Sequence, residues 1–223
     1  MRAIVVADIH GDREALLNLK NSVMDKDVEY FFLLGDYSPG FKDQAENEED
    51  VNFILEALAD YKVKAIPGNC DQKKALDTFQ ARNANMHNTV LEFPGVAIMG
   101  FGGSNPTPFG TPFEYSEEEI YTQVKNLLSS TKNKKTILMV HSPPKDTACD
   151  VIKNGAHVGS SSLRKVIEED SPDLVLCSHI HESAGKEDKI RKTRVLNVGR
   201  ISEGWAYMLD IDGEDIDIEF YTG

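Results

Sequence analysis

Short apolar runs recur along the chain and predict buried strands. Each run is rich in β-branched or aliphatic residues and ends in polar residues or glycine, as strands of a parallel sheet do. The runs are AIVVA at 3–7, YFFLL at 30–34, VAIMGF at 96–101, TILMV at 136–140, DLVLC at 173–177 and RVLNV at 194–198, with a shorter one, KAIP, at 64–67.

Between these runs, apolar residues return at helical spacing. The pattern predicts helices at 13–24, 48–61, 116–130 and 161–171. Ser116 and Glu119 form a capping-box pattern at the start of the third, and Pro172 ends the fourth. This alternation of strands and helices predicts a layered α/β fold.

The last part of the chain follows a different pattern. Residues 205–221 alternate between apolar and polar around Asp212 and Gly213, which predicts a β-hairpin. The stretch 100–115 is rich in Gly and Pro and is expected to be a structured loop at the rim of a site. No repeat or linker divides the sequence, so we expect a single domain over residues 1–223.

Composition narrows the classes of partner. The net charge of −13 disfavours long nucleic acids and anionic membranes. The apolar run at the start is too short for a signal peptide, and no stretch approaches the ~20 apolar residues of a membrane span. Cys70, Cys149 and Cys177 are odd in number and form no C-x-x-C pair, which favours a reducing, cytoplasmic location. A homo-oligomer stays open.

The strongest signal lies where the predicted strands end. Polar residues with metal-ligand chemistry follow five of these strands, and the carboxyl ends of strands in an α/β sheet lie along one edge. We therefore expect them to converge in space: Asp8, His10, Asp36, Asn69, His141, His179 and His181. Any one of them alone would more often belong to a loop or to a hydrogen-bonded core, but five coincidences are hard to attribute to chance.

The residue types indicate which ions would bind. Carboxylate, amide and imidazole together suit divalent ions such as Mn, Fe, Ni or Zn. Seven ligands exceed the needs of one tetrahedral site. They suit a pair of ions about 3.5–4 Å apart that would clamp a phosphoryl oxygen and activate a bridging hydroxide.

The series D-x-H, G-D, G-N-x-D, H and x-H-x-H resembles the calcineurin-like metallophosphoesterases, most closely their small phosphodiesterase branch, from residue 8 to about residue 199. The resemblance implies a four-layer αββα sandwich. It also implies that Asp8, His10 and His181 hold one metal, that Asn69, His141 and His179 hold the other, and that Asp36 bridges them.

Two positions depart from the family pattern. Ser178 replaces the Gly of G-H-x-H, which could tighten or redirect that turn. In the segment GNCD at 68–71, Cys70 stands where the family has a His that contacts the leaving-group oxygen. The resemblance therefore places Asn69 at the catalytic centre as a ligand near the substrate and puts Cys70 in the slot of the acid. A redox role for Cys70 is a weaker alternative, because no resolving cysteine is evident.

Four further residues lie outside the predicted metal site. His157 precedes a predicted helix and is a candidate for substrate contact and catalysis; otherwise it is a loop residue. Arg200 follows the strand at 194–198 and is a candidate contact for an anion. His87 lies in a polar connector and is expected to be exposed, and Trp205 is expected to pack in the core.

Three functions stay in consideration. The first is a phosphoesterase that acts on small phosphodiesters or activated phosphomonoesters. The second is a non-catalytic metal-binding scaffold with the same fold; members of that kind tend to lose ligands, whereas all seven are present here. The third, a nuclease for long nucleic acids, is disfavoured by the acidic charge and by the lack of a basic stripe.

Overall fold

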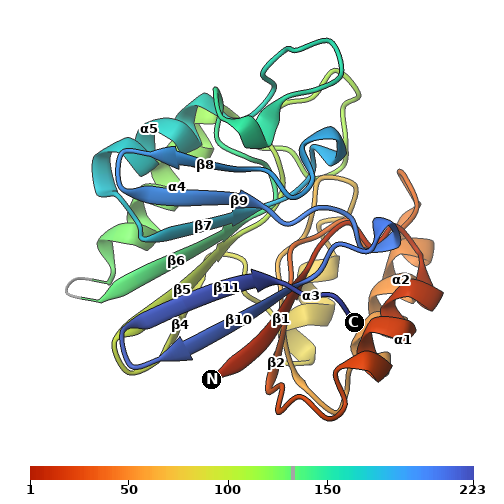
Figure 1. Cartoon of the computed structure of the whole chain (residues 1–223). Helices are drawn as coiled ribbons and strands as arrows, with labels where there is room; N and C mark the ends of the chain where they lie inside the picture. Colours follow the sequence, from red (N-terminus) through yellow and green to blue (C-terminus); the bar gives the residue numbers. More distant parts are fainter. Residues whose placement is uncertain (132–133) are drawn as a thin grey trace.

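Two β-sheets pack face to face and helices cover their outer faces (Figure 1). The computed structural model describes residues 1–131 and 134–223. The first sheet has the strand order β11-β10-β1-β2-β3, and the second has the order β4-β5-β6-β7-β9-β8. This is the predicted four-layer αββα sandwich.

The first sheet combines the start and the end of the chain. Its strands β1, β2 and β3 run parallel, and β10 and β11 are added antiparallel beside β1. Its strands are β1 (Arg2–Val6), β2 (Tyr30–Leu33), β3 (Lys62–Ala65), β10 (Tyr207–Asp212) and β11 (Asp215–Phe220).

The second sheet is built from the middle of the chain. Strands β5, β6, β7 and β9 run parallel, and antiparallel strands β4 and β8 lie at the two edges. Its strands are β4 (Thr89–Glu92), β5 (Val96–Phe101), β6 (Lys135–Val140), β7 (Leu174–Cys177), β8 (Glu187–Ile190) and β9 (Thr193–Asn197).

Alternation of side chains explains the layers. On β1, Ala3 and Val5 point into the core between the two sheets, whereas Ile4 and Val6 point to the helices on the outer face. All four are fully buried, so β1 is apolar on both faces. The three cores that result separate the four layers.

The helices occupy the outer layers as expected, with some shifted ends. They are α1 (Arg13–Ser22), α2 (Gln44–Ala57) and α3 (Ala75–Ala81) on the first sheet, and α4 (Glu117–Ser129) and α5 (Ser161–Asp170) on the second. The capping box of Ser116 and Glu119 is present. Helix α2 begins four residues earlier than predicted, because the Asp43 side chain accepts a hydrogen bond from Glu46 N and caps it.

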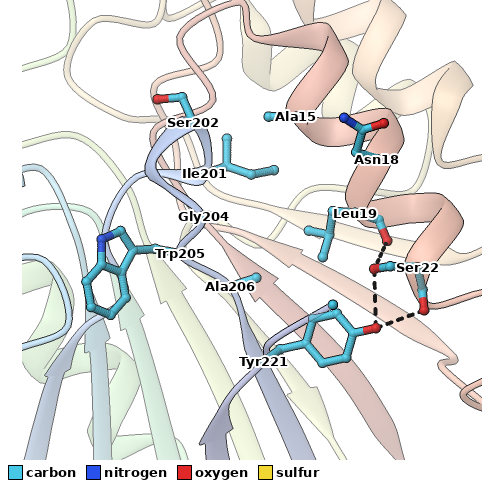
Figure 2. A pocket seen from close by; sticks show the side chains of 11 residues that line it. Ala15, Asn18, Leu19, Ser22, Ile201, Ser202, Gly204, Trp205, Ala206 and Tyr221 are labelled. Atoms are coloured by element: carbon cyan, nitrogen blue, oxygen red, sulfur yellow. Dashed lines mark hydrogen bonds between the residues drawn. The ribbon is translucent and has the colours of Figure 1, made fainter.

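The predicted hairpin is β10–β11, closed by a turn at Gly213 and Glu214. After β11 the Tyr221 hydroxyl donates to Ser22 O at 2.8 Å and ties the segment to α1, beside a shallow hollow (Figure 2). Trp205, which is partly buried, packs against the core between the sheets, as expected.

The prediction for His87 is wrong. Its side chain is buried, with 7% exposed, and not in a solvated connector. Gly102 N donates to its Nδ1 at 3.0 Å, and the Tyr115 hydroxyl lies 3.1 Å from its Nε2. His87 thus holds the rim loop at 102–115 against the start of β4.

None of the helices in residues 1–131 and 134–223 combines the length and apolarity needed to cross a bilayer.

Candidate metal centre

The polar residues at the strand ends meet between the carboxyl ends of the two sheets. Asp8 and His10 follow β1, Asp36 follows β2 and Asn69 follows β3; His141 follows β6 at once, and His179 and His181 follow β7. Parallel strands bring these loops to the same edge, and His10 N donates to Asp36 O at 2.9 Å between two of them.

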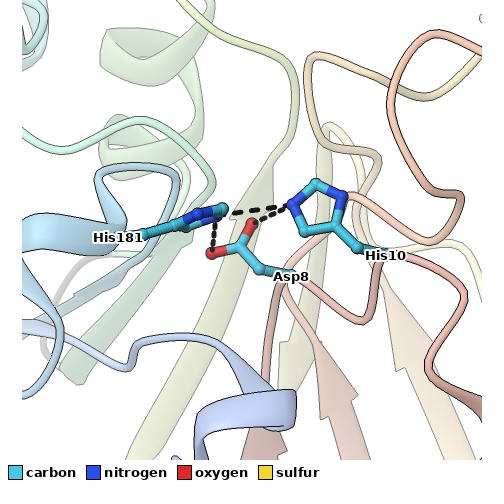
Figure 3. Close-up of side chains that lie close together, drawn as sticks. All are labelled: Asp8, His10 and His181. Carbon is cyan, nitrogen blue, oxygen red and sulfur yellow. Dashed lines mark hydrogen bonds and ion pairs between the residues drawn. The ribbon is translucent and has the colours of Figure 1, made fainter.

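One group consists of Asp8, His10 and His181, whose ligand atoms all lie within 4.8 Å of one another (Figure 3). His181 Nε2 lies 3.5 Å from Asp8 Oδ2, and the Nε2 atoms of the two histidines are 3.4 Å apart. Asp8 Oδ1 is buried and has no hydrogen-bond partner among the described residues. Unpaired ligand atoms that face a common point are the arrangement a cation requires.

The second group consists of Asp36, His141 and His179, again within 4.8 Å of one another. Asn69 joins it, since its Oδ1 lies 3.0 Å from His141 Nε2. Asp36 and His141 are almost completely buried.

The Asp36 carboxylate connects the two groups. Its Oδ2 atom lies 3.8 Å from His10 Nε2 in the first group and 3.5 Å from His141 Nε2 in the second. The other oxygen, Oδ1, accepts a hydrogen bond from Cys70 N at 2.9 Å, which orients the carboxylate.

Backbone carbonyls orient two of the imidazoles. His10 Nδ1 lies 3.1 Å from Ser38 O, and His141 Nδ1 lies 2.7 Å from Leu34 O. A carbonyl only accepts, so each Nδ1 carries a proton, and each ring can present an Nε2 lone pair to the centre once its Nε2 is deprotonated.

The buried carboxylates favour positive charge at this place. Burial alone would lower the pKa of His141, but Asp36 and Asp8 raise it to about 9. The hydrogen bond with Asp8 likewise raises the pKa of His181. By contrast, burial and the neighbouring His141 lower the pKa of His179 to about 4. The same negative charge of Asp8 and Asp36 would stabilise a bound cation, so the residues present fit a pair of metal ions.

Sequence comparison assigns the chain to a known family. The model of the family described as calcineurin-like phosphoesterase matches residues 1–183. The chain belongs to this family.

Relatives of this chain include an uncharacterized protein of Methanocaldococcus jannaschii, 41% identical over 148 residues, which are 64% of this chain and 66% of that protein. A probable cyclic nucleotide phosphodiesterase of Colwellia psychrerythraea is 23% identical over 180 residues, 79% of this chain and 66% of that protein. In both cases the match spans slightly less than two thirds of the relative. A dimetal phosphatase of Danio rerio has a similar fold, with a TM-score of 0.71 at 9% identity over 99% of this chain and 95% of that one.

Four of the gathered residues have left-handed backbone angles. The φ values are 49° at Asp8, 45° at His10, 56° at Asp36 and 69° at His179. Residues other than glycine rarely adopt this region, and such strain concentrates at functional sites where the surroundings hold it in place.

Asp71 is a residue of the centre whose role the sequence did not reveal. It is fully buried, and its carboxylate accepts hydrogen bonds from Gly68 N at 2.7 Å and Asp36 N at 2.9 Å. The carboxylate thereby holds the loop that carries Asp36 against the turn that carries Asn69. Burial, and to a lesser extent the nearby carboxyl of Asp36, raises the pKa of Asp71 to about 6. The only hint in the sequence was the position of Asp71 two residues after Asn69 in the segment GNCD.

The two departures from the family pattern lie against the centre. The Ser178 hydroxyl donates to Asp8 Oδ2, so it contacts a gathered carboxylate. Cys70 is buried beside Asp36, and burial together with that carboxylate raises the pKa of its thiol.

The remaining candidates lie near or outside the two groups. Arg200 lies close enough to His181 for its charge to oppose the rise in that residue's pKa that Asp8 causes, and the Arg200 Nε is buried without a hydrogen-bond partner among the described residues. His157 lies outside both groups, with its Nδ1 2.6 Å from Asp150 Oδ1.

Proposed function

We propose that this phosphoesterase hydrolyses small phosphodiesters or activated phosphomonoesters with two divalent metal ions. The observation that carries the proposal is the position of Asp36 Oδ2, which faces His10 in one group and His141 in the other. One carboxylate oxygen between two sets of ligands is the geometry of a dinuclear centre.

Each set has its own proposed ion. Asp8, His10 and His181 would hold the first ion, Asn69, His141 and His179 the second, and Asp36 both. When bound, the two ions supply Lewis acidity towards a phosphoryl oxygen and activate a water as nucleophile. Mn, Fe, Ni and Zn all suit this ligand set.

The chain's own residues would bind and orient the ester. The Asn69 amide, at the meeting point of both sheets, and the Arg200 guanidinium, beside His181, are the proposed contacts for the phosphoryl oxygens. The Arg200 Nε, which has no partner in the part of the chain that the structure describes, supports this role, since a buried donor gains most from an anionic acceptor. His157 is kept only as an outer contact, because Asp150 already binds its Nδ1.

Leaving groups that need no proton should be favoured. Cys70 stands where an acid would protonate the leaving oxygen, and a thiol is a poor general acid compared with an imidazolium. We therefore expect aryl esters, whose phenolate leaves unprotonated, to be hydrolysed faster than simple alkyl esters.

The activities of two similar proteins support this reaction class. One is a probable cyclic nucleotide phosphodiesterase and the other a dimetal phosphatase. Both names describe hydrolysis of phosphate esters.

The test is reconstitution of metal-free protein with Mn, Ni, Fe or Zn, each assayed on a panel of mono- and diesters. Chelation should abolish hydrolysis of bis(p-nitrophenyl) phosphate, and Mn or Ni should restore it. Full activity with a single tightly bound ion per chain would contradict the dinuclear centre.

The alternative is a metal-binding scaffold without activity. The presence of both complete ligand groups favours the enzyme, because a scaffold has no need to keep every ligand. Two bound metals per chain without turnover of any ester in the panel would favour the scaffold instead.

A further inference from the structure

A cavity of about 670 Å³ opens beside the candidate metal centre. It is lined by the rim-loop segment 105–109, by residues 152–154 and Val158, and by His179, Ile180 and Glu182. His179 belongs to the second metal group as well, so the cavity and the centre share a residue. A phosphate held at the centre would therefore carry its organic group towards this cavity.

The lining is mainly apolar. Such a surface, next to a polar reaction centre, suits a hydrophobic or aromatic group of ligand size. The apolar residues are Pro106, Pro108, Phe109, Ile152, Val158 and Ile180.

Phe109 is the most exposed large apolar side chain at this cavity, with 74% of its surface accessible. Covering an exposed ring with a flat group is favourable, because the apolar faces of both groups leave water. The two prolines beside it, Pro106 and Pro108, restrict the backbone and keep the wall rigid.

Hydrogen bonds hold the walls in position without a ligand. Asn105 accepts from the Ser142 hydroxyl at 2.6 Å and donates to Val158 O at 3.2 Å, so it ties two parts of the lining together. Glu114 accepts from the Thr107 hydroxyl at 2.6 Å and from Thr111 N at 2.7 Å and fixes the loop on either side of Phe109. A preformed cavity selects its ligand by shape at little cost in ordering.

We propose that this cavity receives an aromatic ring carried by the phosphate ester and that Phe109 stacks on this ring. The inference rests on the proposed function and adds the substrate class: esters of phenolic or nucleoside-like alcohols, rather than of small alkyl alcohols or sugars. A methyl or sugar group would leave the apolar walls in contact with water.

Binding of two non-hydrolysable anions tests the inference without any turnover. Phenylphosphonate and methylphosphonate carry the same phosphonate group, and only the first has a ring. Calorimetric titration into manganese-loaded protein should give a tighter Kd for phenylphosphonate. Phe109→Ala should reduce this preference by about threefold to tenfold, the worth of one aromatic pair, and leave the Kd of methylphosphonate unchanged.

Two further variants make the comparison specific. Phe109→Tyr keeps the ring and should keep the preference. Met24→Ala removes another exposed apolar side chain, 67% accessible, just after α1 and before the amino end of β2, and should change neither Kd. A titration with adenosine 5′-monophosphate then separates nucleoside esters from phenolic ones: sensitivity to Phe109→Ala identifies the nucleobase as a ring that the cavity accepts.

The possible failures are distinguishable. Equal affinities for the two phosphonates, or a preference that survives Phe109→Ala, would overturn the inference. A ring preference that depends on Phe109, together with no hydrolysis of any ester, would support the cavity's role and overturn only the proposed reaction.

Discussion

The oxygen atoms of the Asp8 carboxylate have different environments. Oδ2 accepts hydrogen bonds from the Ser178 hydroxyl and from His179 N, whereas Oδ1 is buried and has no partner within residues 1–131 and 134–223. The two oxygens of the Asp36 carboxylate also differ: Oδ1 accepts a hydrogen bond from Cys70 N, and Oδ2 faces both ligand groups. At the scale of single residues, the protein orients each carboxylate through one oxygen and keeps the other available.

Ser178 is predicted to position Asp8 for metal binding. Ser178→Ala removes the hydroxyl donor, and loss of such a supporting hydrogen bond typically weakens metal affinity 10- to 100-fold. We expect calorimetry to show weaker binding of one ion and unchanged binding of the other. Ser183→Ala is the matched control, because that buried serine bonds to Val151 and not to a ligand. Unchanged affinity for both ions in Ser178→Ala would contradict the role.

Cys70 is predicted to be dispensable when the leaving group needs no proton. Cys70→Ser should hydrolyse aryl esters almost as the native chain does. Cys70→His should raise turnover of alkyl esters, by at most the roughly 10²–10⁴-fold of general acid catalysis, with little change on nitrophenyl esters. Loss of aryl-ester hydrolysis in Cys70→Ser at unchanged metal content would show instead that the thiol takes part in the chemistry.

At the scale of elements, the buried strands were the most predictable parts, because apolar runs such as 96–101 coincide with β5. The edge strands β4 and β8 escaped prediction, since most of their residues are exposed or half-buried and neither contains a long apolar run. The gathering of the expected ligands was predictable, because strand ends are easily located in the sequence and parallel strands end at the same edge of a sheet. His87 was misjudged because its burial depends on Tyr115 and Gly102, which no local pattern connects to it.

His87 is predicted to make stability depend on pH. Burial lowers its pKa from 6.5 to about 4, and protonation would remove the acceptor of Gly102 N. The unfolded chain therefore binds this proton first, so the free energy of unfolding should be fully retained above pH 6.5 and fall as the pH drops towards 4. The linked loss is about 3 kcal/mol.

The measurement is urea unfolding of metal-free protein at several pH values. The His87→Gln variant is the comparison, because the other titrating groups remain in it and cancel. Parallel pH profiles for the two proteins would contradict the prediction.

At the scale of the whole molecule, the centre joins the two sheets. One ligand group takes Asp8 and His10 from the first sheet and His181 from the second, and the other takes Asp36 from the first and His141 and His179 from the second. Bound metal would therefore crosslink the halves of the sandwich. It would also neutralise two buried carboxylates in a chain of net charge −13.

Added Mn is predicted to raise the melting temperature. At 100 times its Kd, a ligand of the native state contributes about 2.7 kcal/mol, which corresponds to roughly 5–10 °C for a protein of this size. Differential scanning calorimetry should show this shift. It should disappear in Asp36→Ala, which lacks the shared ligand, and persist in part in His10→Ala, which keeps the second group. No shift at millimolar metal would argue against the centre.

The pairing of β1 with β10 has a consequence for biosynthesis. Residues 2–5 find their antiparallel partners at residues 207–210, so β1 leaves the ribosome long before its partner β10 does. At typical elongation rates this interval is roughly 10–40 s. During it one edge of a strand that is apolar from Ala3 to Val6 has unpaired backbone groups, which favours pairing with other nascent chains. Holdase chaperones should therefore matter more for the yield of this protein than its eventual stability would suggest.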